Sequence, residues 1–293
     1  MLGSALRESL SACNSSILQL VRSAPSAPDK LQWNPASSPA IPHVEALEGI
    51  TAAVHLSGAS LATRRWTDDY KQEIVESRVA STRALANTLA GLKNPPRALL
   101  VASAIGIYGN RGNELLDETS TPGRGFLAET CQQWEAAAQP AAAAGIRVLH
   151  LRFGVILDSG SGALGKMLPL FRLCLGGKLG TGEQYMSWIS LPDAVAGILF
   201  LLDAPSLSGP FNFCAPNPVT NAQFTRALAQ QLHRPAIFSV PAFALRLAFG
   251  QMADEALLSS CRAYPAKLAA AGFQFSHASI VHALPAVLAP HKL

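Results

Sequence analysis

Residues 98–109 read ALLVASAIGIYG, an apolar run of strand length that ends at Ser103 and leads into a glycine-containing turn. Continuous apolar runs of this kind are typical of strands in a parallel sheet, which helices bury on both faces. Open α/β sheets bind ligands at the carboxyl ends of their strands. The stretch therefore predicts an α/β fold with a ligand site at the sheet edge where Ser103 lies.

Similar apolar runs alternate with longer segments of helical period along the chain, which predicts a doubly wound parallel sheet of Rossmann type. The expected strands cover residues 17–21, 31–33, 52–56, 98–102 and 148–151, and the expected helices cover 69–92, 126–144 and 195–202. We expect this domain to span residues 1–165, with part of 186–215 completing the sheet. Residues 166–293 are expected to form a smaller α+β lobe for the substrate.

Composition excludes several classes of protein. The 293 residues are 49% hydrophobic and 14% charged, so a folded core is expected, and the basic residues behind the net charge of +4 are too scattered to indicate nucleic acid. The longest apolar stretch, 194–202, is roughly half the length that spans a bilayer, and no secretory signal is evident. The 5 cysteines and 7 histidines show no metal-ligand spacing. We expect a cytoplasmic protein with no metal and no membrane contact.

Several motifs carry a family resemblance. The segments LSGA at 56–59, ALLVASAIGIYG at 98–109 and LRFGVIL at 151–157 resemble the extended short-chain dehydrogenase/reductase superfamily. More specific segments are FLAE at 126–129 with WE at 134–135, GALGKMLP at 162–169, YMSWI at 185–189, RAYPAKL at 262–268 and GFQF at 272–275. These are similar to its sugar-epimerase-like "epimerase family" branch of NAD-dependent epimerases/dehydratases, which carries a small C-terminal domain, here at about 240–290.

The resemblance implies NAD(P) binding in a Rossmann-type fold, with a small-molecule substrate in the cleft beside the C-terminal lobe. An arginine after the second family strand, here Arg22, pairs with a 2′-phosphate and favours NADP, although NAD is possible. Arg22 could equally be a solvated loop residue; for the small residues at 57–59 a tight turn is the structural alternative, and the cofactor role is preferred. The implied cofactor-binding residues are Gly3, Arg22, Ser57, Gly58, Ala59, Arg78, Ser103, Phe153, Gly154 and Val155.

The catalytic candidates are Ser103, Tyr108 and Glu129. The superfamily's usual Tyr-x-x-x-Lys pair, in which the lysine lowers the tyrosine pKa, is absent from the helix that begins at Phe126. A strand-end cap, a packed aromatic ring and a solvated helix face are the structural alternatives for the three candidates. The resemblance makes Lys166 and Trp188 candidates for substrate contact, a solvated lysine and a core tryptophan being the alternatives.

Two residues near position 190 carry further expectations. Ser190 occupies a position where the branch often has histidine, which removes a possible acid/base group. Asp193 is expected to cap the helix over 195–202.

The N-terminus departs from the family pattern. Of the G-x-x-G-x-x-G turn that follows the family's first strand, only Gly3 is present, and no counterpart of that strand precedes it. The family strand lies between those at 17–21 and 52–56, so we expect a gap or rearranged pairing there. We interpret the chain as N-terminally truncated, with a natural start upstream, and expect it to bind NADP(H) weakly because the phosphate cradle is incomplete.

Two functions from different classes remain open. The first is an NAD(P)-dependent oxidoreductase or epimerase acting on a small molecule, such as a nucleotide sugar. The second is a non-catalytic NAD(P)-binding or scaffold protein, or an inactive truncated relative, which the missing Tyr-x-x-x-Lys pair and Ser190 favour.

Overall fold

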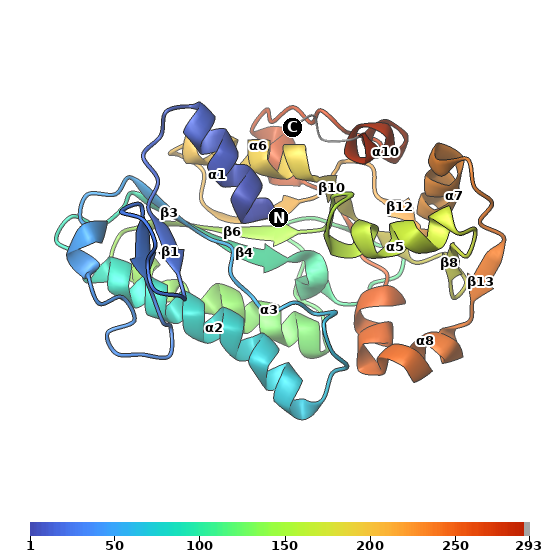
Figure 1. Cartoon of the computed structure of the whole chain (residues 1–293), viewed down its shortest axis with the longest axis horizontal. Coiled ribbons are helices and arrows are strands. Elements are labelled where there is room, and N and C mark those ends of the chain that lie inside the picture. Colours follow the sequence, from blue (N-terminus) through green and yellow to red (C-terminus); the bar gives the residue numbers. More distant parts are fainter. Residues whose placement is uncertain (290–293) are drawn as a thin grey trace.

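The computed structural model describes residues 1–289, and at its centre is a four-stranded parallel sheet (Figure 1). The strands are β3 (Ala52–His55), β4 (Ala98–Ala104), β6 (Arg147–Phe153) and β11 (Gly209–Phe213), in the spatial order β11-β6-β4-β3. In the register of this sheet, Ser103 at the end of β4 lies opposite Arg152 of β6. The predicted α/β fold and Rossmann-type sheet are confirmed.

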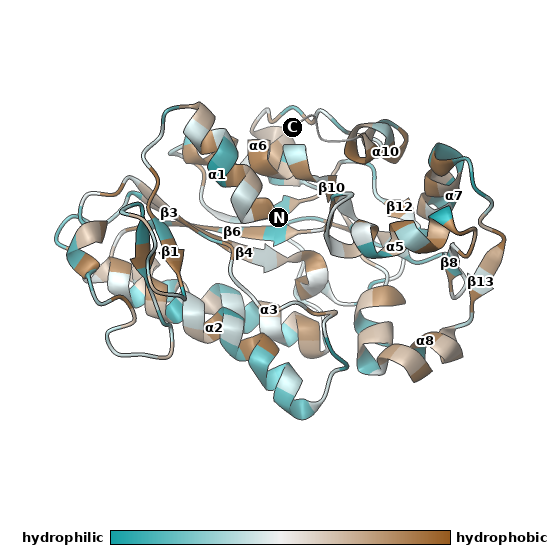
Figure 2. Cartoon of the chain, viewed as in Figure 1, coloured by the Kyte–Doolittle hydropathy of each residue, from teal (hydrophilic) through white to brown (hydrophobic). Residues whose placement is uncertain are grey.

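Helices cover both faces of this sheet, because successive strand residues point to opposite sides. Leu100 of β4 faces α1 (Leu2–Ala12) and α6 (Leu191–Leu202), whereas Leu99 faces α2 (Asp68–Ala90), α3 (Phe126–Ala136) and α4 (Gln139–Ala143). In Figure 2, α2 alternates between hydrophilic and hydrophobic residues, as expected for a helix with one face in water. The sheet is therefore the middle of three layers.

Two local predictions differ from the structure. The single helix expected over 126–144 is two helices, because the chain ends α3 and restarts at α4 with Pro140 in the first turn, where proline is tolerated. Asp193 does not cap the last predicted helix, which begins at Leu191 with Ser190 as its N-cap: the Ser190 hydroxyl accepts the Asp193 N–H at 3.2 Å. The Asp193 carboxylate instead accepts the backbone N–H groups of Ser276 and His277, each at 2.9 Å.

The sheet is interrupted where the sequence predicts an interruption. Strands β1 (Gln19–Val21) and β2 (Lys30–Gln32) pair only with each other, and a short 3₁₀ helix, η1 (Val44–Leu47), follows them. Within residues 1–289, no strand lies between this pair and β3. The Trp33 ring, just after β2, packs edge-on against His55 at the end of β3, with 5.7 Å between ring centroids. Side-chain packing joins the two sheets where backbone pairing does not.

The remaining segments build a second lobe from helices and short strand pairs. The helices are η2 (Ile105–Tyr108), α5 (Gly162–Arg172), α7 (Asn221–Leu232), α8 (Ala242–Phe249), the π-helix η3 (Ala253–Leu257), α9 (Ala266–Ala270) and α10 (Ile280–Leu288). The parallel pairs are β7 (Val155–Leu157) with β10 (Trp188–Ser190), β8 (Gly177–Leu179) with β13 (Phe238–Val240), and β5 (Leu115–Leu116) with β14 (Arg262–Ala263). Strand β9 (Tyr185–Met186) pairs antiparallel with β12 (Val219–Thr220).

The second lobe and the sheet share residues, so the boundary expected at residue 165 remains a prediction. Strand β11 and helix α6 come from the later half of the chain, and Leu268 and Phe273 pack in the same apolar cluster as Phe211 of the sheet. No helix in residues 1–289 is both long and apolar enough to cross a membrane.

Gly154, between β6 and β7, provides a test of this packing. A Cβ at this position would lie 2.7 Å from the carbonyl oxygen of Ser187, a backbone atom that cannot move independently of its strand. We expect Gly154→Ala to lower the free energy of unfolding by about 1–3 kcal/mol, the usual cost of overpacking. Urea unfolding measures this. Gly3→Ala is the control, since nothing lies within 4 Å of the Cβ it would add, and an equal loss in both variants would contradict the prediction.

Candidate functional site

A cavity of about 410 Å³ opens where β1 and β3 end. Its lining brings Arg22, which follows β1, together with Ser57, Gly58 and Ala59, which follow β3. Parallel strands present their carboxyl ends at the same edge, so residues distant in sequence meet there. The structure thus gathers these predicted cofactor-binding residues into one pocket, which we call the strand-end pocket.

Arg78 of α2, another predicted cofactor residue, does not line this pocket but contacts the turn at 57–59 that does. Its guanidinium donates from Nη2 to the carbonyl oxygen of Ala59 at 2.9 Å and from Nη1 to that of Ile74 at 3.0 Å, and it stacks 5.2 Å from the centre of the Trp134 ring. Burial lowers the Arg78 pKa from its ordinary value. A Cβ at Gly58 would lie 3.3 Å from Arg78 Cζ, a close contact that an alanine here would avoid only if the Arg78 side chain shifted by a few tenths of an ångström.

Two charged residues line the strand-end pocket, Arg22 and Glu73, and only Glu73 has an ion-pair partner within residues 1–289. Arg22 is exposed and makes no hydrogen bond or ion pair with any other described residue. Glu73, which also lines the pocket, lies 3.6 Å from the guanidinium of Arg64. Arg22 is therefore the charged group of the pocket that is available to an anion.

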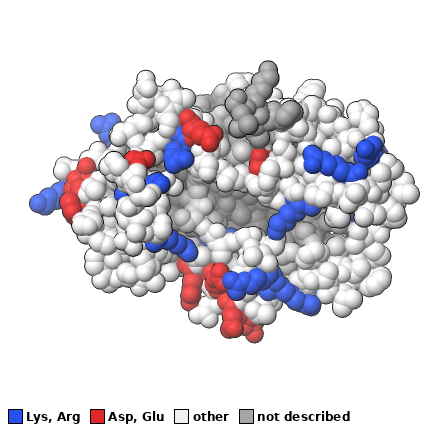
Figure 3. All heavy atoms as spheres, in the orientation of Figure 1, with Lys and Arg blue, Asp and Glu red and all other residues white. Residues whose placement is uncertain are grey.

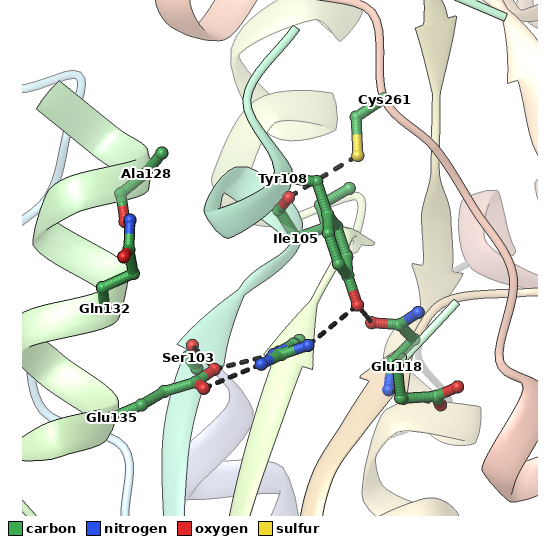
Figure 4. Close-up of polar contacts among 10 residues, drawn as sticks. Ser103, Ile105, Tyr108, Glu118, Ala128, Gln132, Glu135 and Cys261 are labelled. Atoms are coloured by element: carbon green, nitrogen blue, oxygen red, sulfur yellow. Dashed lines mark hydrogen bonds and ion pairs between the residues drawn. The ribbon is translucent and has the colours of Figure 1, made fainter. Parts of the chain in front are cut away.

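Ser103 belongs to a buried polar network behind the sheet edge (Figure 4). Its hydroxyl donates to Glu135 Oε1 at 2.8 Å, and Arg152 donates to both oxygens of the same carboxylate, at 2.8 and 2.9 Å. Burial alone would raise the pKa of Glu135, but the hydrogen bonds and charge of Arg152 outweigh it and the pKa is lowered. The pKa of Arg152 is raised, because Glu135 outweighs the opposing effect of its burial.

Tyr108, the second catalytic candidate, lies in the same network. Its hydroxyl donates to Asn212 Oδ1 at 2.7 Å and accepts from Arg152 Nη1 at 3.0 Å. The side chain is fully buried, and burial raises its pKa to about 12. Tyr108 is therefore protonated at neutral pH, and its hydrogen bonds are already made within the protein.

The other candidates lie outside this network. Glu129 is exposed on α3, with no side-chain partner among the described residues. Lys166 on α5 donates to the carbonyl oxygen of Ala62 at 2.9 Å, in the loop that follows β3. Trp188 is fully buried in an apolar cluster, and its Nε1 has no hydrogen-bond partner in the described part of the chain. Their roles in catalysis or substrate binding remain predictions.

The remaining predicted cofactor residues lie near chain junctions. Gly3 lies in the first turn of α1. Met1 precedes this helix, and its sulfur lies 3.8 Å from the position that a Cβ on Gly162 would occupy. Phe153 packs edge-on against Phe213, with ring centroids 5.0 Å apart, and Val155 pairs with Trp188 across β7 and β10. Their role in cofactor binding remains a prediction.

Sequence reasoning noted Glu135 as a polar residue of the helix that begins at Phe126, but it missed Arg152 and the pairing of the two residues at the centre of the network. The signal was present, because Arg152 interrupts an apolar strand that helices bury on both faces, and a buried charge requires a partner. The partner's identity could not be predicted, since Glu135 lies on a different element. Within residues 1–289, no group of three or more His, Cys, Asp or Glu side chains is placed to hold a metal ion.

A parallel sheet covered on both faces, with a small-residue pocket at the carboxyl ends of its strands, defines a Rossmann-type α/β protein. The family model for the NAD dependent epimerase/dehydratase family matches residues 1–214, and the chain belongs to this family. A model for a domain of unknown function, DUF1731, matches residues 240–287. The predicted family and its C-terminal domain are confirmed.

Relatives extend over nearly the whole chain. An epimerase family protein of Mycobacterium bovis, Mb2239, is 44% identical over 97% of this chain and 93% of its own length. YfhF of Bacillus subtilis, also an epimerase family protein, is 37% identical over 89% and 85%. The crystal structure of human epimerase family protein SDR39U1 (isoform 2) with NADPH has a TM-score of 0.90 and 29% identity, and covers 98% of this chain and 95% of that one.

Removal of one partner of the buried ion pair should be strongly destabilising. Arg152→Met would leave the Glu135 carboxylate buried without a cation, and we expect this to lower the free energy of unfolding by about 3–5 kcal/mol. The double variant Arg152→Met/Glu135→Leu removes both charges and should recover a substantial part of that loss. Urea unfolding measures both. A double variant less stable than the single one would contradict this account.

The same pair predicts a pH dependence. Because the folded-state pKa of Glu135 is lowered, its contribution is present above its unfolded-state pKa and is lost as the pH falls through the folded-state value. We therefore expect the stability difference between the native protein and Glu135→Gln to be largest near pH 7 and to shrink below pH 4.5, the ordinary glutamate value. Unfolding measured across this pH range checks it, and a constant difference would contradict it.

Proposed function

We propose that the protein is an NADP-dependent oxidoreductase or epimerase that acts on a small molecule. The proposal rests on the strand-end pocket, where Arg22 and the small-residue turn at 57–59 line the same cavity. The Arg22 side chain has no hydrogen-bond or ion-pair partner among the described residues. Small residues let a dinucleotide backbone approach the chain closely, and a guanidinium pairs with a 2′-phosphate through charge-assisted hydrogen bonds. The residues present therefore fit NADP, and NAD remains a weaker alternative.

Two relatives support the choice of cofactor and substrate class. The human relative with a TM-score of 0.90 was crystallised with NADPH. MoeE5, whose structure holds UDP-glucuronic acid and NAD, shares the fold at a TM-score of 0.73 but only 19% identity. From the human relative we infer that this protein prefers NADP. From MoeE5, whose support is weaker, we propose a nucleotide-sugar-like substrate.

Bound in the strand-end pocket, NADP would supply or accept a hydride at its nicotinamide ring. The chain's own polar groups nearby are already hydrogen-bonded to one another. Ser103 donates to Glu135, and Tyr108, which is protonated, is bonded to Asn212 and Arg152. A direct contact of Ser103 with substrate or nicotinamide requires its hydroxyl to turn away from that carboxylate. Glu129 and Lys166 carry polar groups on the surface, and we retain them as candidates for proton transfer and substrate binding.

A second candidate function is supported by the same network. Because Tyr108 is buried and hydrogen-bonded on both sides, and no Tyr-x-x-x-Lys pair is present, a non-catalytic NADP-binding protein is the alternative. In either case we propose a cytoplasmic protein whose partner is a small molecule rather than nucleic acid or a membrane. Turnover distinguishes the two candidates.

Arg22→Gln tests the cofactor assignment. We expect it to weaken NADPH binding about 10-fold, the value of a lost charge-assisted contact, and to leave NADH binding nearly unchanged, because only NADPH carries the 2′-phosphate. Titration of nicotinamide fluorescence measures both. Arg83→Gln is the matched control, since Arg83 is another exposed arginine without a described partner. Equal weakening of both cofactors would remove the phosphate assignment.

Ser103→Ala tests catalysis. If the protein is an enzyme, hydride transfer from NADPH to a panel of ketones and nucleotide sugars should be measurable in the native protein and abolished in this variant. NADPH affinity and the melting temperature show whether the variant still folds. Binding of NADPH without turnover of any panel member by the native protein would favour the non-catalytic alternative.

A further inference from the structure

A second cavity lies on the C-terminal lobe, between α7, β8 and β13, and has a volume of about 590 Å³. Volumes in this range are typical of sites for small ligands. None of its lining residues borders the strand-end pocket. We call it the basic pocket, because its charged lining residues are Lys178, Arg226 and Arg234, with His233 beside them and no carboxylate.

These cations lack acidic partners. No carboxylate within residues 1–289 forms an ion pair with Lys178, Arg226 or Arg234. On the face shown in Figure 3, the right-hand part of the molecule, over α5 and α7, carries basic side chains and no acidic ones. Uncompensated cations around a concave surface create a positive potential that attracts anions.

Basic side chains can also serve a purely structural role by stabilising the carboxyl ends of helices. This role explains only some of the basic residues that line the pocket. Arg234 donates to the carbonyl oxygens of Arg172 and His233, at 3.3 and 3.4 Å, and these carbonyls lie at the ends of α5 and α7, where a cation is stabilising. Lys178 has one backbone acceptor, Thr181, at 3.3 Å. Arg226 lies in the middle of α7 and makes no hydrogen bond with a described residue. Helix-end stabilisation therefore does not account for Arg226.

Two further features indicate the kind of ligand. The Thr225 hydroxyl, in the wall of the basic pocket, is buried and has no hydrogen-bond partner among the residues described. At the rim, the side chain of Ile237 is 82% exposed, which is unusual for an isoleucine. The pocket thus combines donors suited to an oxyanion with an apolar surface beside them.

We propose that the basic pocket binds an organic phosphate. The phosphate group lies among Lys178, Arg226 and Arg234, where each oxygen can accept a charge-assisted hydrogen bond. The apolar body of the ligand lies against Ile237 and removes it from water. This site is separate from the strand-end pocket and does not depend on the protein's binding NADP.

The test is isothermal titration calorimetry of the full chain with phenyl phosphate and with inorganic phosphate. We expect both to bind at low ionic strength, with phenyl phosphate binding more tightly. Arg226→Gln should weaken both about 10-fold, whereas Arg83→Gln, the same change of charge at a surface arginine of α2, should have no effect. Ile237→Ser should remove the preference for phenyl phosphate and leave inorganic phosphate unchanged.

Several outcomes would overturn the proposal. One is the absence of binding by either probe at millimolar concentration in a protein whose melting curve is normal. Another is equal weakening by Arg226→Gln and Arg83→Gln, which would indicate only general charge attraction. Loss of binding in Arg22→Gln but not in Arg226→Gln would place the anion in the strand-end pocket. Melting temperatures of all variants establish that they fold, which is expected because each changed side chain is exposed.

Discussion

The buried ion pair between Arg152 and Glu135 constrains the sheet edge on which the site depends. Two charges removed from water are tolerated only when their hydrogen bonds are complete, because desolvation costs several kcal/mol per ion. Each nitrogen of the Arg152 guanidinium has a partner, because Nε and Nη2 donate to Glu135 and Nη1 donates to Tyr108, which in turn donates to Asn212. The chain of bonds joins α3 to β6, to η2 at the end of β4, and to β11, so their relative positions are fixed where a ligand would approach.

This constraint divides the polar groups near the strand ends into two kinds. Those of the network, such as Ser103 and Tyr108, already have partners, and a ligand that binds one of them must first replace a hydrogen bond. Arg22, in the strand-end pocket, is exposed and has no partner among the described residues, so a ligand displaces only water from it. At this edge the unpartnered charged group is therefore the one proposed to bind a cofactor, whereas the catalytic candidates there, Tyr108 and Ser103, are already hydrogen-bonded.

Much of the fold could be predicted from sequence, because strands buried on both faces are continuous apolar runs and their ends must meet at one edge. The family resemblance assigned Arg22 and Gly58 to one cofactor site, and the structure brings both into the lining of one pocket. The apolar pattern could not predict where the helix after Phe126 ends, since its alanine-rich sequence keeps a helical pattern through Pro140. Nor could it pair Arg152 with Glu135, because that contact depends on the rotation of α3 relative to the sheet.

Helix α3 also connects the C-terminal domain to the polar network. The carboxylate of Glu255, on η3, accepts the first free N–H groups of α3, those of Phe126 at 3.1 Å and Leu127 at 2.8 Å, and a negative charge is stabilising at that end of a helix. Arg152 holds the same helix through Glu135, two turns further along. Helix α3 is thus held near its first turn by the C-terminal domain and near its last turn by the sheet, and its position relative to the network depends on both sets of hydrogen bonds.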